Sequence, residues 1–218
     1  LPPIKKYFHE GDPPKLDGSD FMNTIFPVRL ELNVCKRSDE ALHEFGMLCR
    51  SSALYDCMAE ARRIFKCETE PAIHLTIDNA RRQELNKEIN QRLAPHGSQL
   101  LEAEDGAILL YEGCPLIGTK IQHGILNGVW YDVVQIDETH LYLKDEKDVE
   151  MRISFDKAAQ VLTLRHAMTV HKSQSRTIEG HIRIHPGKEP GDVSRYWSLN
   201  HLLVAASRAT ELANLSIE

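Results

Sequence analysis

The sequence has 218 residues, a mass of 24.8 kDa, a formal net charge of −6 and a 27% share of charged residues. A chain of this length can bury a substantial core without disulfides or metals, and a 42% share of hydrophobic residues argues against wholesale disorder. The negative charge excludes a polycation of the histone kind, so any nucleic-acid contact must be local. The apolar runs are too short for a membrane-spanning helix, so we expect no membrane partner.

The start of the chain and its cysteines indicate what kind of polypeptide it is. The first residues, LPPIKKYFHEGDPP, contain neither an initiator Met nor an apolar secretory core, which we interpret as the cut end of a larger polypeptide. An odd number of cysteines without a C-x-x-C pair is typical of reduced intracellular thiols. We therefore expect an intracellular protein, nuclear or cytoplasmic, without a bound metal. The cysteines are Cys35, Cys49, Cys57, Cys67 and Cys114.

The first part of the chain predicts an extended segment followed by helices and one strand. Residues 1–27 carry many Pro, Gly and Asp residues without a sustained period, so we expect them to be extended. Ser38 stands before two acids as a plausible N-cap. Helical spacing continues to Phe65, a buried strand is predicted over 72–77, and a helix begins near Asp78. The apolar positions of these helices are Leu42, Phe45, Leu48, Cys49, Leu54, Met58, Ala61, Phe65, Leu85, Ile89 and Leu93.

The middle of the chain changes character. Between residues 107 and 164, short β-rich runs are separated by an Asn-Gly pair and acidic turns, which predicts a small sheet or barrel. Strands are then predicted over 163–170 and 180–185, a helical turn around 173–178 and an apolar helix over 199–208. We therefore expect an α/β lobe interrupted by a small β insertion. The β-rich runs are ILLYEG, PLIGTK, VWYDVVQI, HLYLKD, MRISF and AQVLTL.

One stretch, LRHAMTVHKSQSRT, joins an apolar strand to a polar turn. Hydroxyls, an amide, an imidazole and two cations in such a turn suit contacts to phosphate. Between Val161 and Lys188 the chain has five Lys or Arg residues and the single acid Glu179, which forms a local basic patch in an acidic chain. On charge alone, the pattern favours a solvated polar loop after a strand.

A second stretch, LLVAASRAT, places Arg208 at the end of a helix of small and aliphatic residues. An arginine in this position is either a surface charge whose stem covers apolar atoms or a cation presented to an anion outside the lobe.

A phosphate-binding loop is missing from the sequence. No G-x-x-x-x-G-K-[ST] pattern exists, since Gly187-Lys188 is followed by Glu189. The chain therefore cannot cradle a triphosphate by itself. The run from Val133 to Glu138 imitates the apolar-then-acidic strand that holds magnesium in such ATPases, but it lies in the β insertion, and we interpret it as a strand and a turn.

Two histidines and two tryptophans are further candidates for functional residues. His181 and His185 would share one face of a strand, but a third zinc ligand is not evident nearby. Trp130 and Trp197 could stack on bases, although packing is the simpler role for each.

Together these stretches resemble superfamily 1 helicases of the RecD-like branch. HAMTVHKSQSRTIEG is similar to the motif V region of that family, an A-x-T-x-H-K-S-Q-G-x-T-like run, and VAASRAT is similar to its motif VI, V-A-L-S-R-A. Asn79 and Asn86 match the asparagines of a T-N-x₆-N segment in which Asp78 replaces Thr. GCPLIGTKIQHGILNGVWYDVV resembles the start of the inserted barrel of the family, and Lys36-Arg37 resembles motif IV.

The chain departs from the family pattern at two further places. Ser175 stands where the family has Gly, which narrows backbone freedom in a turn close to phosphate. Tyr131 replaces the second Gly of the barrel signature. The motif IV arginine corresponds either to Lys36 or to Arg37.

The resemblance implies a RecA-like lobe of P-loop NTPase type, with a parallel sheet flanked by helices and an inserted small Src-homology-3-like β-barrel. Residues 28–112 and 163–218 would form the second RecA-like lobe, and residues 113–162 the barrel. The lobe would act in ATP-dependent unwinding of nucleic acid with an N-terminal RecA-like lobe of the same polypeptide. That lobe would hold most of the ATP and Mg²⁺. The partner would be single-stranded nucleic acid, DNA by analogy with the branch.

The resemblance also assigns roles to individual residues. Arg208 and Arg37 would be catalytic, acting on the transferred phosphoryl group, while Lys36, Gln174 and Ser175 would bind ATP. The residues expected to contact nucleic acid are Thr169, His171, Lys172, Ser173 and Asn79.

Two other functions stay open. The chain could be a non-enzymatic, helicase-like module that docks on nucleic acid or on a protein, as the net negative charge and Ser175 allow. Alternatively, the lobe could belong to an RNA helicase, because related motifs occur in both classes.

Overall fold

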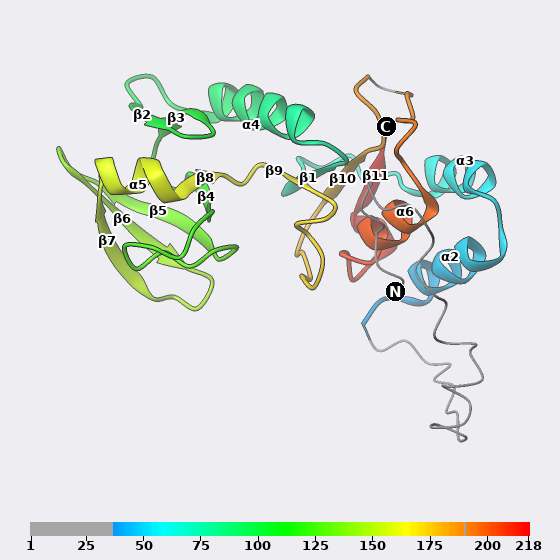
Figure 1. Cartoon of the computed structure of the whole chain (residues 1–218). Coiled ribbons are helices and arrows are strands. Elements are labelled where there is room, and N and C mark those ends of the chain that lie inside the picture. Colours follow the sequence, from blue (N-terminus) through cyan, green and yellow to red (C-terminus); the bar gives the residue numbers. More distant parts are fainter. Residues whose placement is uncertain (1–36, 190) are drawn as a thin grey trace, which may run out of the picture.

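The computed structural model describes residues 37–189 and 191–218 and contains two main sheets joined by a long helix (Figure 1). The first is a four-stranded sheet in which all neighbouring strands are parallel. Its central strands alternate apolar and polar residues, and every position of them is buried except the half-buried Arg183 of β10. Its strands, in spatial order, are β11 (Leu215–Ile217), β10 (Ile182–His185), β1 (Ile73–Thr76) and β9 (Ala167–Thr169).

Three helices cover one face of the parallel sheet. They are α2 (Glu40–Ser51), α3 (Leu54–Ile64) and α6 (Leu199–Ala206), and a 3₁₀ turn, η2 (Leu212–Asn214), leads into β11. Alternate strand residues point into this core because successive side chains leave a strand on opposite faces. The buried cluster includes Ile73, Leu75, Ile182, Ile184, Leu215, Leu42, Phe45, Met58, Leu202 and Val204.

The second main sheet is antiparallel, has five strands and has a core of its own. A short helix, α5 (Phe155–Val161), leads into its last strand, and the hairpin of β2 (Gln99–Ala103) and β3 (Gly106–Leu110) forms a separate sheet nearby. The strands of this antiparallel sheet, in spatial order, are β7 (Glu150–Ser154), β6 (His140–Asp145), β5 (Trp130–Ile136), β4 (Pro115–Gly118) and β8 (Leu162–Leu164).

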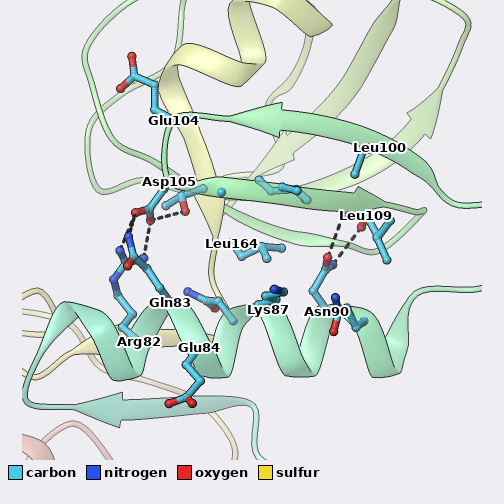
Figure 2. A pocket seen from close by; sticks show the side chains of 16 residues that line it. Arg82, Gln83, Glu84, Lys87, Asn90, Leu100, Glu104, Asp105, Leu109 and Leu164 are labelled. Carbon is cyan, nitrogen blue, oxygen red and sulfur yellow. Dashed lines mark hydrogen bonds and ion pairs between the residues drawn. The ribbon is translucent and has the colours of Figure 1, made fainter.

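Helix α4 (Asn79–Leu93) connects the parallel sheet to the hairpin and the antiparallel sheet. The buried Asn86 donates to the carbonyl of Ala167 (3.1 Å) and accepts from its N–H (2.7 Å), so it satisfies the free edge of β9. One turn later, Asn90 makes the same pair of bonds with Leu109 of β3 at 2.9 and 2.8 Å, as Figure 2 shows. The helix thus hydrogen-bonds to the edges of two different sheets.

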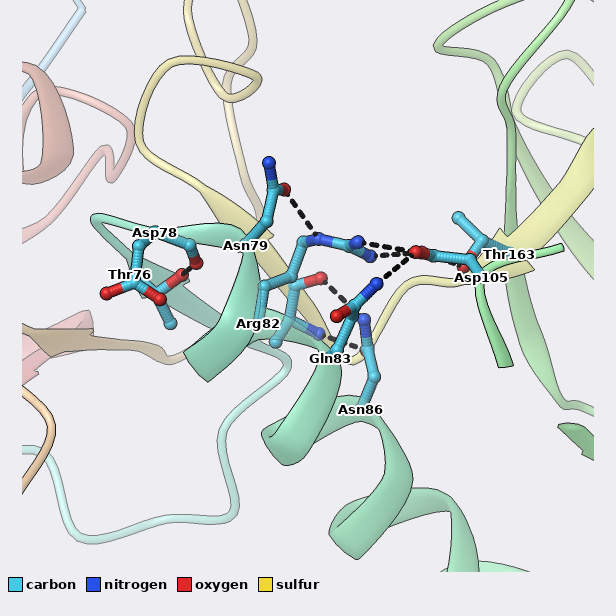
Figure 3. A network of polar contacts seen from close by, with 9 residues as sticks. Thr76, Asp78, Asn79, Arg82, Gln83, Asn86, Asp105 and Thr163 are labelled. Carbon is cyan, nitrogen blue, oxygen red and sulfur yellow. Dashed lines mark hydrogen bonds and ion pairs between the residues drawn. The ribbon is translucent and has the colours of Figure 1, made fainter. Parts of the chain in front are cut away.

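The N-terminal end of α4 adds a charged contact (Figure 3). Arg82 forms an ion pair with Asp105, at the turn of the hairpin, with 2.7 Å between Nη1 and Oδ2. Asp105 also accepts from Gln83 and from Thr163 of β8. Burial alone would raise the pKa of Asp105, but the hydrogen bonds from Arg82, Gln83 and Thr163 outweigh it and lower the pKa to about 2. Asp105 is therefore ionised at neutral pH.

The mixed α/β fold predicted from the sequence is confirmed, but several local predictions are wrong. The N-cap of α2 is Asp39 and not Ser38, because the Asp39 carboxylate accepts from the N–H of Leu42 at 2.8 Å. Leu48 and Leu93 are 38% and 44% exposed, so they lie outside the helix faces that are buried.

The strand predicted over 163–170 is two strands in different sheets. Residues 162–164 pair with β4 in the antiparallel sheet, whereas residues 167–169 pair with β1 in the parallel sheet. The helical turn predicted around 173–178 is wrong, since residues 170–175 form non-helical turns.

Two of the predicted β-rich runs are arranged differently from the expectation. ILLYEG contributes β3 to the hairpin, and the first half of AQVLTL belongs to α5. The remaining runs form the antiparallel sheet, whose closure into a Src-homology-3-like barrel, like the domain boundaries, stays a prediction. Residues 1–27 lie outside the described residues.

Three of the four cysteines that the structure describes are buried, and all four are free thiols. Cys35 lies outside the described part of the chain. No helix among the described residues is long and apolar enough to cross a membrane.

We expect Asn86→Ala to destabilise the chain, because the N–H and C=O of Ala167 would lose their partners in a buried environment. A loss of about 3 kcal/mol in the free energy of unfolding is expected from two such groups. Urea unfolding would measure it, with Lys87→Ala, an exposed neighbour on α4, as the matched control. Equal stabilities of the two variants would contradict the role of Asn86.

Candidate functional site

The carboxyl ends of β1 and β9 bring together two of the residues that the sequence predicts to contact nucleic acid. Asn79 follows β1 and Lys172 follows β9, and both line one cavity of about 390 Å³. Ligands of open parallel sheets bind at this end of the strands. The other lining residues come from α4, the turn of the hairpin, the loop after β4, α5 and β8, and they are Arg82, Gln83, Glu104, Asp105, Thr119, Lys120, Ala159, Gln160 and Leu162.

The turn after β9 holds its own shape through local hydrogen bonds. The buried Ser173 donates from its hydroxyl to the carbonyl of Val170 (2.8 Å), and its N–H donates to the carbonyl of Thr169 (3.1 Å). The Thr169 hydroxyl accepts from the N–H of Lys172 at 3.3 Å. Thr169 and Ser173 therefore shape the turn, whereas the Lys172 side chain is exposed.

His171, Gln174 and Ser175 complete the turn. The His171 ring lies edge-on against that of His201, with 5.4 Å between centroids. Gln174 and Ser175 are exposed, and Ser175 adopts a left-handed conformation with φ of 70°. The turn thus has the backbone shape that Gly favours, although the residue is Ser.

Arg208 is buried against this turn, with an exposed fraction of 3%. Its Nη1 donates to the carbonyls of Ser173 (3.2 Å) and Arg176 (2.9 Å), and its Nε donates to that of Val204 (3.0 Å). The interpretation of Arg208 as a surface charge is therefore wrong. The guanidinium instead ties the end of α6 to the turn after β9.

Arg37, which precedes α2, contacts the same backbone segment as Arg208. Its Nη2 donates to the carbonyl of Arg176 (2.9 Å) and to the hydroxyl of Thr177 (3.1 Å), and its side chain is exposed. Neither Arg37 nor Arg208 forms an ion pair with a carboxylate of the described residues. Burial, and then the charge of Arg37, lower the pKa of Arg208. Two guanidinium groups thus share one carbonyl oxygen, and no acid of the described residues pairs with either of them.

Lys36, the other motif IV candidate, lies outside the described residues, so the choice between Lys36 and Arg37 rests on the contacts of Arg37 alone.

The basic patch predicted between Val161 and Lys188 is partly neutralised. Arg165 pairs with Asp132 (2.7 Å), and Arg176 pairs with Glu146 (3.0 Å), both acids of the antiparallel sheet or its turns. Both guanidinium groups also stack on the ring of Trp130, 4.4 and 4.6 Å from its centroid. Arg176 was missed as a site residue because its partners are distant in the sequence.

The remaining motif residues have structural contacts. Trp197 is buried and stacks on His201 with 5.5 Å between centroids. His185 is hydrogen-bonded to His74 (2.8 Å) and to Glu218 (2.9 Å), and burial lowers the pKa of His74 to about 3. No group of three or more metal-ligating side chains lies together in the described ranges. The run from Val133 to Ile136 lies in β5, a strand of the antiparallel sheet.

We expect Ser175→Val to destabilise the chain by about 1–2 kcal/mol, because a β-branched residue is strained at a positive φ. Ser175→Gly, the matched variant, should be tolerated. Thermal unfolding of both variants would measure the difference. A Val variant as stable as the Gly variant would show that residue 175 is not left-handed in solution.

Solved structures of Pif1 helicases match the fold. A Bacteroides Pif1 helicase in complex with ADP-AlF3 and single-stranded DNA is 17% identical, with a TM-score of 0.64, over 87% of this chain and 51% of that chain. The values for Bacteroides Pif1 bound to single-stranded DNA are 17%, 0.62, 83% and 49%. For Candida albicans Pif1 they are 13%, 0.56, 82% and 53%.

The chain spans about half the length of these proteins. At such identities the likeness shows the fold, a mixed α/β lobe with a parallel sheet and helices that matches the RecA-like lobe of Pif1 helicases. No protein-family model matches the chain, and no curated protein matches it.

Proposed function

We propose that the chain is the second motor lobe of an ATP-dependent DNA helicase of the RecD-like branch of superfamily 1. The observation that carries the proposal is the meeting of Arg37 and Arg208 on the carbonyl of Arg176, in the turn that exposes Lys172. The two arginines proposed to act on a nucleotide therefore bind the same short backbone segment that carries Lys172, the residue proposed to contact nucleic acid. Such a segment suits a lobe that couples ATP hydrolysis to movement along a strand.

The positions of Arg37 and Arg208 favour binding of an anion, because the two positive charges lie close to each other. The two like charges repel each other, and a phosphate that enters between them would remove this cost. Arg37 is exposed and can meet a phosphate directly. Arg208 would have to exchange its bonds to the carbonyls of Ser173 and Arg176 for a bond to phosphate. Charge on the transferred phosphoryl group would then be stabilised, as arginine fingers do in other ATPases.

The nucleotide itself would be held by a second lobe. The sequence lacks a phosphate-binding loop, and the described residues include no cluster that could hold a metal. We propose that an N-terminal RecA-like lobe holds ATP and Mg²⁺, with Gln174 and Ser175 facing the nucleotide from this chain. Mg²⁺ would neutralise charge on the phosphates there.

Single-stranded DNA is the proposed partner at the other side of the turn. The solved neighbours include Pif1 bound to single-stranded DNA and two Pif1 helicases at forked duplex DNA. In this chain Lys172, His171 and Asn79 would contact a strand that crosses the ends of β1 and β9. The support is that Asn79 and Lys172 line one cavity and that Thr169 and Ser173 shape the turn. Contacts to phosphate and sugar would be independent of sequence, as translocation requires.

Stepping would follow from closure of the cleft between the lobes. Binding and hydrolysis of ATP would close and open the lobes, and the grip on the strand would alternate between them. The family resemblance implies travel in the 5′-to-3′ direction.

A non-enzymatic docking module is the competing function. The buried state of Arg208 favours it, because the same bonds would serve a lobe that never meets a nucleotide. The presence or absence of ATP hydrolysis stimulated by a single strand separates the two, and comparison of DNA with RNA strands separates a DNA helicase from an RNA helicase.

We expect Lys172→Ala to weaken binding of single-stranded DNA of every sequence to a similar degree. Loss of one phosphate contact should lower the slope of log affinity against log salt by about 0.7 to 1. Fluorescence anisotropy with labelled oligonucleotides at several salt concentrations would measure it. Lys66→Ala, an exposed lysine beside β11 at the far edge of the sheet, is the control. An unchanged slope in the Lys172 variant would place the strand elsewhere.

We expect Arg208→Ala to reduce ATP turnover of the complete helicase by on the order of 10³ or more, with ATP still bound by the other lobe. Steady-state ATPase assays and nucleotide binding would test this. Because Arg208 is buried, Arg37→Ala at an exposed position provides a variant whose folding is not at risk. Turnover near that of the unmodified protein in both variants would contradict the catalytic role.

A further inference from the structure

Arg176 has contacts on two sides of the molecule. Its carbonyl oxygen accepts hydrogen bonds from Arg37 and from Arg208, both at 2.9 Å. Its side chain points the other way, where Nη1 pairs with Glu146 at 3.0 Å and Nη2 donates to the carbonyl of Gly128. One residue therefore connects the two arginines of the proposed nucleotide side with the antiparallel sheet.

The side chain of Arg176 contacts residues of the antiparallel sheet and of its turns. Its guanidinium stacks on Trp130, the first residue of β5, and Arg165 stacks on the same ring. Arg165 is in turn fixed by an ion pair with Asp132 of β5. Burial is the main cause that lowers the pKa of Arg165, and repulsion from the like charge of Arg176 lowers it further. Asp132 and Glu146 compensate this repulsion, so the stack has matched charges.

The chain passes between the two sheets next to this stack. Arg165 lies in the short connection between β8 and β9, and Arg176 lies in the turn after β9. In Figure 1 the turn after β9 lies between the parallel and the antiparallel sheets. The Arg176 side chain thus contacts the antiparallel sheet, while the Arg176 carbonyl contacts the two guanidinium groups.

We infer that Arg176 is a positioning residue that couples the antiparallel sheet to the nucleotide side of the lobe. The inference rests on the proposed function. Arg176 would not touch DNA or ATP, because its guanidinium is occupied by Glu146, Gly128 and Trp130. It would hold the turn so that Lys172 faces the strand while Arg37 and Arg208 face the phosphate.

A direct phosphate contact by Arg176 is the alternative, and two conservative variants separate it from positioning. Arg176→Lys keeps the charge but loses the fork that pairs with Glu146 and the planar stacking on Trp130. Glu146→Gln removes the anchor without changing the turn. Glu138→Gln removes one charge from the same sheet, at a residue with none of these contacts, and is the matched control.

Steady-state ATPase assays on the complete helicase, with and without oligo-dT, would test the inference. Arg176→Lys and Glu146→Gln should each lower kcat about 10-fold with KM for ATP changed less than about twofold, since misplacement of catalytic groups costs turnover. Glu138→Gln should match the unmodified protein. The inference is overturned if the charge-keeping Lys variant turns over normally, or if Glu146→Gln strengthens DNA binding, as release of Arg176 toward phosphate would do.

Fluorescence of Trp130 gives a readout that does not depend on ATP hydrolysis. The chain has two tryptophans, so Trp197→Phe makes Trp130 the single emitter. Loss of the stacked guanidinium in Arg176→Lys should change its intensity, and Glu138→Gln should not. Unchanged emission in Arg176→Lys would overturn the inference. If the emission intensity of Trp130 changes in Arg176→Lys as expected, but the unmodified helicase shows no ATPase activity stimulated by DNA, the proposed function fails instead.

Discussion

The arrangement of the molecule depends on buried hydrogen bonds from one face of α4. An edge strand leaves N–H and C=O groups without partners, and burying them without partners is costly. Asn86 satisfies β9 and Asn90 satisfies β3. Arg82 pairs with Asp105, which also accepts a hydrogen bond from Thr163 of the antiparallel sheet. Two sheets with separate cores are thereby held in a defined relation, because the buried side chains of Asn86, Asn90 and Arg82 have their partners on different sheets.

The position of the candidate site follows from that relation. The cavity beside Asn79 and Lys172 exists because the hairpin and the antiparallel sheet lie close to the carboxyl ends of β1 and β9. The turn after β9 lies between this cavity and α6. Its shape is fixed from one side by Arg37 and Arg208 and from the other by the contacts of the Arg176 side chain. A small backbone segment thus collects contacts from three parts of the fold.

Local pattern predicted most elements but not the sheet to which each belongs. Helical spacing identified α2, α3 and α4, and apolar runs identified β1 and β10. The run from Thr163 to Val170 was predicted as one strand, yet the chain changes sheets at Arg165 and His166. Both halves are apolar and β-rich, so periodicity could not separate them. Asn86 was noticed as a motif residue, but its partner Ala167 lies 81 residues away.

The sequence alone determined which residue types meet in the site: a polar turn after an apolar strand, an arginine at the end of an apolar helix, and no phosphate loop. It could not decide whether Arg208 lies on the surface or against the turn. That was decided by tertiary structure, because the carbonyls of Arg176 and Ser173, which accept from its Nη1, lie 32 and 35 residues away. Hydrogen bonds over such separations form only when the sheet and α6 have packed, and no local pattern encodes them.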